Sequence, residues 1–309
     1  MLDALGNAGS FLVTILMEII PLFLVVTFFA GLALEYISQE TLRRYLAGKK
    51  SFIGLLSAVI FGFITPFCSC STIPVLAGMI SAGIPIGVLT AFLFASPYPI
   101  EIALIVLGPI FGWPLAFTFV FVGAAIAFLS GLVVEKLGWQ NQVKPMLIPL
   151  VAVNNVGNGA AETANGDFKV KVKRAAKYSL DFFKKLAVYI VIGSIVGAFI
   201  YGFVPADLVA TYAGGSNILA VPIAALIGVP LYVSIMPIIP IIYSLYLKGL
   251  SAGAVIAFLI TATAISPPEL IMLSGMFKKK YIAFFIVAMT LGAIVTGYLF
   301  NIISYGWLK

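Results

Sequence analysis

Long apolar runs, interrupted by a few clusters of lysine and arginine, constrain this chain more than any other feature. The first run, from Phe11 to Leu34, is long enough to cross a bilayer, and 62% of the 309 residues are hydrophobic whereas 9% are charged. A water-soluble domain cannot bury so much apolar surface. The N-terminus lacks the cationic region and cleavage site of a secretory signal, so the first run is expected to stay in the bilayer. The sequence therefore predicts an all-α polytopic protein of the cell membrane.

The basic residues predict which loops face the cytoplasm. Four follow the first run (Arg43, Arg44, Lys49 and Lys50), and nine lie between Lys136 and Lys185. Because Lys and Arg are enriched in cytoplasmic loops, both clusters, Lys248 and Lys278–Lys280 are expected inside. The formal net charge of +7 is thus explained by topology, and no nucleic-acid partner is expected.

A weak internal repeat divides the chain into two halves. At a shift of 166 residues, Gly62 falls on Gly228 and Pro74 falls on Pro240. Because basic clusters flank opposite ends of matching segments, the two halves are expected to be inverted. The predicted organisation is an N-terminal transmembrane repeat at 1–135, a flexible basic cytoplasmic linker at 136–182 and a C-terminal transmembrane repeat at 183–309.

The parity of the crossings predicts that one apolar segment in each half turns back. If all four segments of the first half crossed, the linker bases would lie outside whenever Arg43–Lys50 lay inside. The best candidates to turn back are Ile86–Pro109 and Ala252–Phe277, because each is interrupted near its middle. Each leg then reaches about halfway through a core of ~30 Å. We expect two re-entrant hairpins with tips at the midplane, beside three spans (one of them broken) in each half.

This topology puts both termini and Gly83 outside and Gly249 inside. The prolines expected to break the helices are Pro66, Pro74, Pro97, Pro99, Pro237, Pro240, Pro267 and Pro268. Proline removes a backbone donor, and broken backbone within a bilayer persists only where protein or a cavity surrounds it.

Both cysteines of the chain lie in one proline-bracketed break, Pro66-Phe67-Cys68-Ser69-Cys70-Ser71-Thr72-Ile73-Pro74. On extended backbone, which the flanking prolines favour, the two thiols point to the same side. Two such thiols suit a soft metal or metalloid, or reversible disulfide chemistry. The alternative is that both are small apolar fillers at a tight helix crossing. The predicted substrate site comprises these thiols, the neighbouring hydroxyls and the matching positions of the second half: Cys68, Cys70, Ser69, Ser71, Ser234 and Met236.

Three carboxylates are predicted within the membrane. Glu101 and Glu269 follow prolines at the two expected hairpin tips, and Glu18 lies in the first apolar run. Intramembrane carboxylates are costly and mark ion or proton pathways, so we predict that these three couple transport to protons. The alternative for Glu101 and Glu269 is helix capping, and both roles can coexist.

Other residue types narrow the chemistry further. The hydroxyls of Thr72, Ser96 and Ser266 are expected to contact substrate or to bond freed backbone carbonyls. The chain has no histidine, and it carries no Walker A motif. No metal, cofactor or direct use of ATP is therefore expected.

The break resembles the signature of a known family. Pro66-Phe67-Cys68-Ser69-Cys70-Ser71, followed by Ser81-Ala82-Gly83-Ile84-Pro85 and Ala95-Ser96-Pro97, is similar to the predicted-permease family that includes YraQ-type proteins and ArsP-type organoarsenical efflux permeases. The resemblance covers nearly the whole chain and implies an inner-membrane permease. In the arsenical branch, the substrates are trivalent methylated or aromatic arsenicals. The family is commonly predicted to have eight full spans, which differs from the count that parity favours.

The predicted function is a secondary permease that moves a soft, thiol-reactive or sulfur-containing small molecule by alternating access, coupled to protons. A mono-substituted trivalent arsenical has two exchangeable positions, which two thiols can fill. The alternative function is a membrane thiol–disulfide oxidoreductase that passes electrons through Cys68 and Cys70 to a thioredoxin-like partner. The permease is favoured because a redox relay needs neither an inverted repeat nor paired glutamates. A channel would need a continuous polar pore lining, which the sequence does not offer.

Overall fold

The computed structural model describes residues 51–64, 69–96, 98, 107–144, 170–177, 219–230 and 250–307, and parts of 17–32 and 179–192. Over these residues the regular elements are helices, and the expected all-α class is confirmed for them. They are α3 (Ser51–Ile64), α4 (Ser69–Ser81), α5 (Ile86–Ala95), α7 (Gly108–Phe111), α8 (Trp113–Lys136), the 3-10 turn η2 (Trp139–Gln142), α13 (Ala220–Gly228), α15 (Ala252–Ala264), α16 (Pro267–Met276) and α17 (Lys279–Trp307).

The two long helices, α8 and α17, are long and apolar enough to cross a membrane. With 24 residues, α8 is about 36 Å long. Its exposed face carries Trp113, Phe117 and Phe121, four residues apart, and each is more than half exposed. A stripe of large apolar side chains at this spacing suits lipid rather than water. The structure and the sequence therefore agree on a membrane protein.

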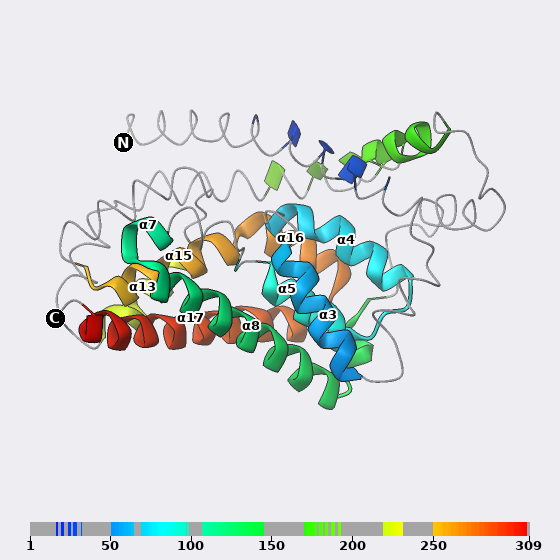
Figure 1. Ribbon diagram of the computed structural model, residues 1–309. Helices are drawn as coiled ribbons and strands as arrows, with labels where there is room; N and C mark the ends of the chain where they lie inside the picture. The colour runs from blue at the N-terminus through cyan, green and yellow to red at the C-terminus, as the bar shows by residue number, and fades with distance from the viewer. Residues whose placement is uncertain are drawn as a thin grey trace.

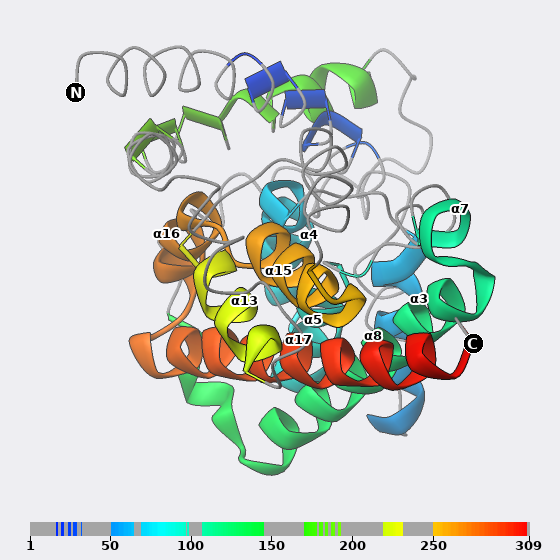
Figure 2. The ribbon, with the colours of Figure 1, turned by 90° about the vertical axis from the view of Figure 1, so that its left-hand side faces the viewer.

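The short helices α5 and α15 lie at the centre of the molecule. Every residue of α5 is buried, and so is nearly every residue of α15. A helix that is apolar on all sides belongs in a core, because it has no face to present to water. In Figures 1 and 2, α5 packs along α8 and α15 packs along α17, while α3 covers α5 and α13 covers α15.

A close glycine contact between α5 and α8 recurs between α15 and α17. If Gly131 were replaced by any larger residue, its Cβ would lie 2.6 Å from the carbonyl oxygen of Gly87. A Cβ added at Gly297 would likewise lie 2.6 Å from the carbonyl oxygen of Gly253. No larger residue fits at this separation, so glycine lets the two backbones touch. The members of each matched pair, Gly87 with Gly253 and Gly131 with Gly297, are 166 residues apart.

The covering helices repeat a second contact. A Cβ on Gly62 of α3 would lie 3.1 Å from the carbonyl oxygen of Phe92, and a Cβ on Gly228 of α13 would lie 3.0 Å from that of Phe258. These residues are again 166 positions apart. The two halves therefore make the same backbone contacts at the positions that the sequence aligns.

The helices α8 and α17 run in opposite directions and cross near their middles (Figure 1). At the crossing, a Cβ on Gly292 would lie 3.0 Å from Cγ2 of Ile126, its counterpart 166 residues earlier. Beyond the end of α8, the ring of Trp139 lies 5.5 Å from the ring of Phe284, near the start of α17. The end of one long helix thus meets the beginning of the other.

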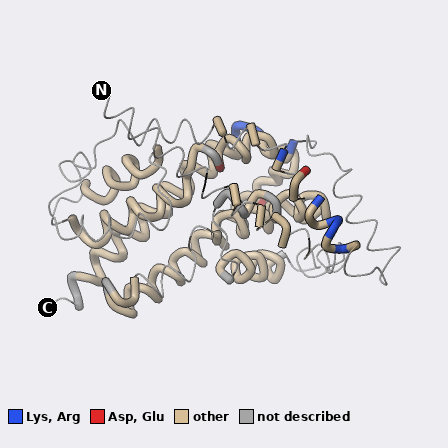
Figure 3. The backbone as a smooth tube through the Cα atoms, turned by 90° about the horizontal axis from the view of Figure 1, so that it is seen from above, with Lys and Arg blue, Asp and Glu red and all other residues tan. Residues whose placement is uncertain are grey.

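We call the end that carries Lys136 and Lys278–Lys280 the lysine end, and the opposite end, where α17 finishes at Trp307, the carboxyl end. Figure 3 shows the described Lys and Arg residues gathered in the half of the molecule toward the lysine end, while the half toward the C-terminus carries none of them. Sequence clusters that are far apart in the chain therefore share one side.

The expectation that Ile86–Pro109 turns back is wrong. This segment begins at the lysine end, where a Cβ on Gly87 would lie 2.9 Å from Oε2 of Glu135. It finishes in α7 and Gly112, which lead directly into the first residue of α8 at the other end. The segment therefore joins opposite ends of α8. The sequence locates the break correctly, but contacts with α8 decide where the chain goes after it.

The segment that turns back is the one with the cysteines. The helix α3 starts at the lysine end, since Cδ2 of Leu55 lies 2.8 Å from the Cβ position of Gly131. After four residues, α4 returns, and it ends four residues before α5 begins at that same end. Gly83 therefore lies at the lysine end, and its expected position opposite Lys136 is corrected. A break of four residues leaves two helices of about 20 Å each, too short to cross alone.

The segment Ala252–Phe277 also joins opposite ends of a long helix. Gly253 lies against Gly297 and Asn301 near the end of α17, and its amide donates to Asn301 Oδ1 at 2.8 Å. The segment finishes just before α17 begins at Lys279. Its two helices, α15 and α16, are bent by 52° at the break, whereas a chain that turned back would have to reverse. The predicted break is confirmed, and the expected return to the starting side is wrong.

Candidate functional site

The cysteine-bearing break lies between the end of α3 at Ile64 and the start of α4 at Ser69. Cys68 and Pro66 lie outside the described residues. Ser69, Cys70 and Ser71 form the first turn of α4, so the extended backbone expected at Cys70 is wrong. Pro74 lies within this helix rather than ending it. It lacks the N–H that would bond the carbonyl of Cys70.

This break lies level with the middle of α8. Gly62, near the end of α3, packs against Ala95 at the end of α5, where a Cβ on the glycine would lie 2.6 Å from Cβ of the alanine. Three residues later, the ring of Tyr98 fills the space left by Gly123, near the middle of α8. The hairpin formed by α3 and α4 therefore ends about halfway along the long helix.

Two buried hydroxyls join the cysteine-bearing helix to the break in α5. The Oγ1 of Thr72 and the Oγ of Ser96 are 2.7 Å apart, and the two side chains are 0% and 4% exposed. Thr72 lies in the first turns of α4, and Ser96 follows the last residue of α5. Within an apolar environment, each hydroxyl satisfies the other. The sequence names both hydroxyls as candidates but does not pair them.

The second half contributes the start of α16. Ser266 is buried, and its Oγ accepts a hydrogen bond of 3.2 Å from the backbone N–H of Glu269. Pro267 and Pro268 begin the helix, and Glu269 is 1% exposed. Serine three residues before glutamate is a capping pattern, so this carboxylate stands at a helix N-terminus, where its charge is favoured. The capping interpretation is confirmed at this position.

The Thr72–Ser96 hydroxyl pair and the Ser266–Glu269 cap are connected through two neighbouring helices, α4 and α16. α4, which begins beside the cysteines, packs against α16, which begins beside Glu269. Both helices start at a break and run toward the lysine end. The breaks of the two halves therefore face the same region of the core.

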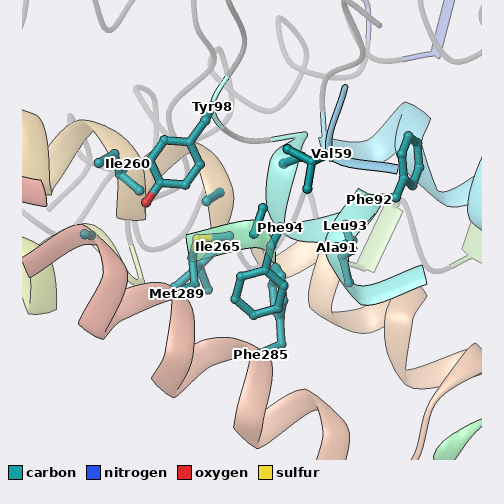
Figure 4. Packing of buried hydrophobic residues seen from close by; sticks show 14 of the residues in the cluster. Val59, Ala91, Phe92, Leu93, Phe94, Tyr98, Ile260, Ile265, Phe285 and Met289 are labelled. Carbon is teal, nitrogen blue, oxygen red and sulfur yellow. The ribbon is translucent and has the colours of Figure 1, made fainter. Parts of the chain in front are cut away.

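Tyr98 is a central residue that the sequence reading missed. It is fully buried, and its ring packs against Phe119 at a centroid distance of 5.2 Å. Its hydroxyl points toward α15 and α17, with Ile260 beside it (Figure 4). A Cβ on Gly292 would lie 3.6 Å from that hydroxyl oxygen. Tyr98 thus connects the break of the first half to the crossing of the two long helices. Its position between two prolines was the available signal.

Several predicted site residues lie outside the described part of the chain. They are Glu18, Pro97, Pro99, Glu101, Ser234, Met236, Pro237 and Pro240. In the described ranges, no group of three or more His, Cys, Asp or Glu could hold a metal ion.

Comparison with known proteins identifies the family. The family model described as "Predicted permease" matches residues 4–302. YcgR of Bacillus subtilis is 23% identical, with 89% of this chain and 90% of that protein covered. A relative from Methanocaldococcus jannaschii is 22% identical, with 89% of each chain covered. YraQ of Escherichia coli is 28% identical over 79% of this chain and 66% of that protein.

No solved structure matches the chain. The family match covers nearly its whole length and includes the cysteine-bearing break, the two long apolar helices and the bent helix pair. The chain therefore belongs to this family of predicted permeases.

Proposed function

We propose that the protein is a secondary permease that moves a soft, thiol-reactive or sulfur-containing small molecule through a site at the tip of the α3–α4 hairpin. The observation that carries the proposal is the position of the only two cysteines. Cys70 lies in the first turn of α4, which begins level with the middle of α8 and packs against α16, where Glu269 is buried. Cys68 directly precedes α4 in the sequence. Broken helices at mid-depth are where secondary transporters bind substrates.

The architecture proposed for this function is a pair of inverted repeats, 1–135 and 183–309, joined by a cytoplasmic linker. The matched glycine contacts 166 residues apart and the opposite directions of α8 and α17 support it. In this arrangement the α3–α4 hairpin enters from one face, and its counterpart, which begins with α13, enters from the other. Each half then has three spans and one re-entrant hairpin.

Moving the hairpin from Ile86–Pro109 to α3–α4 changes the side of only a few loops in the proposed topology. With the lysine end in the cytoplasm, both termini lie outside, and sixteen of the eighteen Lys and Arg residues are cytoplasmic; Lys248 and Lys309 are the exceptions. This distribution follows the rule that basic loops stay inside. Gly83 is then cytoplasmic, and Gly249 is outside.

The proposed chemistry rests on the two thiols and the carboxylates. Cys68 and Cys70 replace the exchangeable ligands of a mono-substituted trivalent arsenical, and the thiolate is the reactive form. Each As–S bond that forms replaces an As–O bond, and the thiol protons leave with the displaced hydroxides as water. Glu269, and by symmetry Glu101, relays these protons from thiol to hydroxide, with Glu18 on the same pathway. Neither the comparisons nor the described residues favour the thiol–disulfide alternative, so one function is proposed.

A flux assay tests the proposal. Purified protein in proteoliposomes should move phenylarsine oxide faster than empty liposomes, and the double variant Cys68→Ser/Cys70→Ser should reduce flux to the empty-liposome level. Thr118→Ser on α8 is the matched control, because that hydroxyl bonds only the carbonyl of Pro114 on its own helix. Wild-type flux from the double variant would refute the role of the thiols.

A further inference from the structure

A group of aromatic residues from α5, the segment after α8 and the region around the start of α17 packs together toward the lysine end. We call the group the aromatic layer: Phe94, Trp139, Phe277, Tyr281, Phe284 and Phe285. The rings of Phe277 and Tyr281 stack at 4.2 Å, and those of Phe94 and Phe285 meet edge to face at 5.2 Å. Figure 4 shows Phe94 pointing to Phe285 across the boundary between the halves. Phe94, the member of the layer on α5, precedes Ser96 in the chain, and the rest of the layer lies nearer the lysine end. The layer therefore lies between the proposed site and the lysine end.

A buried hydrogen bond crosses the same boundary. Oγ1 of Thr90 donates to the carbonyl of Ile86 at 2.8 Å, and the Tyr281 hydroxyl lies 2.9 Å from that same Oγ1. Because the threonine proton is already committed, the tyrosine is the donor between them. Both side chains are 0% exposed. This bond joins α5 of the first half to α17 of the second.

The segment that follows α8 packs against the surface of the aromatic layer. Gly138 turns it with φ of +63°, a conformation that glycine adopts freely. Residues 139–144, which we call the strap, then pair with the corner between α16 and α17. The amide of Lys144 donates to Met276 at 2.8 Å, the amide of Lys278 donates to Gln142 at 2.9 Å, and Lys280 Nζ lies 5.0 Å from the Trp139 ring centroid.

Among the described residues, the carboxyl end has no counterpart of the Thr90–Tyr281 pair or of the strap. The positions that match Thr90 and Tyr281 are Ile256 and Leu115, which are buried but have no polar side-chain atom. The helix α17 continues to Trp307, whereas α8 ends at Lys136 and turns into the strap. The pair and the strap therefore break the correspondence between the halves at one end only.

We propose that the aromatic layer is the gate on the lysine end, kept shut by the Thr90–Tyr281 bond and fastened by the strap. This inference rests on the proposed function, in which substrate reaches the hairpin tip from each side in turn. Opening toward the lysine end must separate α5 from the start of α17, because the layer spans both. The gate is a two-state element that each of these contacts biases toward the closed state.

A thiol-accessibility experiment tests the gate independently of substrate. The background is Cys68→Ser/Cys70→Ser, and Ser96→Cys supplies one reporter thiol just beyond the layer. A membrane-impermeant maleimide is applied to inside-out and right-side-out vesicles. Tyr281→Phe removes the bond but leaves the ring stack, and it leaves no donor orphaned because Thr90 keeps its bond to Ile86. Loss of one hydrogen bond should raise reporter modification from the lysine end about 2- to 10-fold.

Further variants separate the gate from general loosening. Thr90→Val leaves the buried Tyr281 hydroxyl without its acceptor, so it should raise modification at least as much as Tyr281→Phe. The double variant Thr90→Val/Tyr281→Phe removes that orphaned donor and should return modification to the level of Tyr281→Phe alone. Trp139→Leu, which weakens the strap, should also raise modification from the lysine end. Thr290→Val, on the same helix beyond the layer, is the matched control and should have no effect, because its hydroxyl bonds the carbonyl of Ile286 on its own helix.

The contrary outcomes are equally specific. Unchanged modification in Tyr281→Phe, or an equal increase from both faces, would overturn the gate. Failure of phenylarsine oxide flux in wild-type protein would refute the proposed substrate, yet the reporter would still respond to Tyr281→Phe if the gate exists.

Discussion

The close approach of α15 and α17 predicts the cost of a single methyl group. A Cβ on Gly253 would lie 1.9 Å from the carbonyl oxygen of Gly297 and 2.7 Å from Oδ1 of Asn301. Ordinary contacts need more than 3 Å, so Gly253→Ala must push two backbones apart by more than 1 Å. Overpacking of this kind costs about 1–3 kcal/mol. Alanine returns roughly 0.5–1 kcal/mol through its helix propensity. The centres of the two ranges leave a net loss of about 1.3 kcal/mol.

The assay is the midpoint of thermal unfolding in detergent, followed by size-exclusion chromatography of heated samples. A loss of this size should lower the midpoint by about 2–6 °C. Gly275→Ala is the matched control, because a Cβ on this helical glycine would meet no atom within 4 Å. Its midpoint should stay the same or rise. Equal midpoints for Gly253→Ala and Gly275→Ala would refute the packing described for α15 and α17.

Three further predictions concern topology, the buried hydroxyls and coupling. Single cysteines at Gly83 and Lys279 should be labelled from the cytoplasm and one at Lys248 from outside; labelling of positions 83 and 248 from one side would contradict the inverted halves. Thr72→Val and Ser96→Ala should each cost about 1 kcal/mol, measured as thermal midpoints, and the double variant should cost no more than the larger of the two, because they share one hydrogen bond. Glu269→Gln should leave phenylarsine oxide binding intact, measured by equilibrium dialysis, and abolish accumulation driven by a pH gradient; undiminished accumulation would remove the carboxylate from the coupling mechanism.

The sequence located the breaks that precede α4 and α16, because proline and glycine act locally, but Pro74, also expected to break a helix, lies within α4. The composition correctly predicts that α15 ends at Ala264 and that a new helix begins at Pro267. It also predicts the interruption between α3, which ends at Ile64, and α4, which begins at Ser69. The repeat also aligned residues that make matching contacts, such as Gly87 and Gly253. These features depend on neighbours within a few residues or on spacing along the chain.

The direction of the chain after each break could not be predicted in the same way. Both Phe52–Ala82 and Ile86–Pro109 are apolar and interrupted near the middle, so parity alone could not choose which one turns back. The choice depends on contacts between distant residues: α5 docks on α8 through Gly87 and Gly131, and this docking carries its segment across. The Thr90–Tyr281 pair escaped notice for the same reason, since its members are 191 residues apart.

The central proposal is tested most directly by asking whether the substrate protects Cys68 and Cys70 from a thiol reagent applied from each face of the membrane. Wild-type protein in vesicles of each orientation is treated with an impermeant maleimide, with and without saturating phenylarsine oxide, and modification of Cys68 and Cys70 is measured by mass spectrometry. A substrate site reached alternately from both faces predicts modification from either side, blocked in both cases by the arsenical. Modification from one face only, or modification that the arsenical does not block, would contradict a transport site at the hairpin tip.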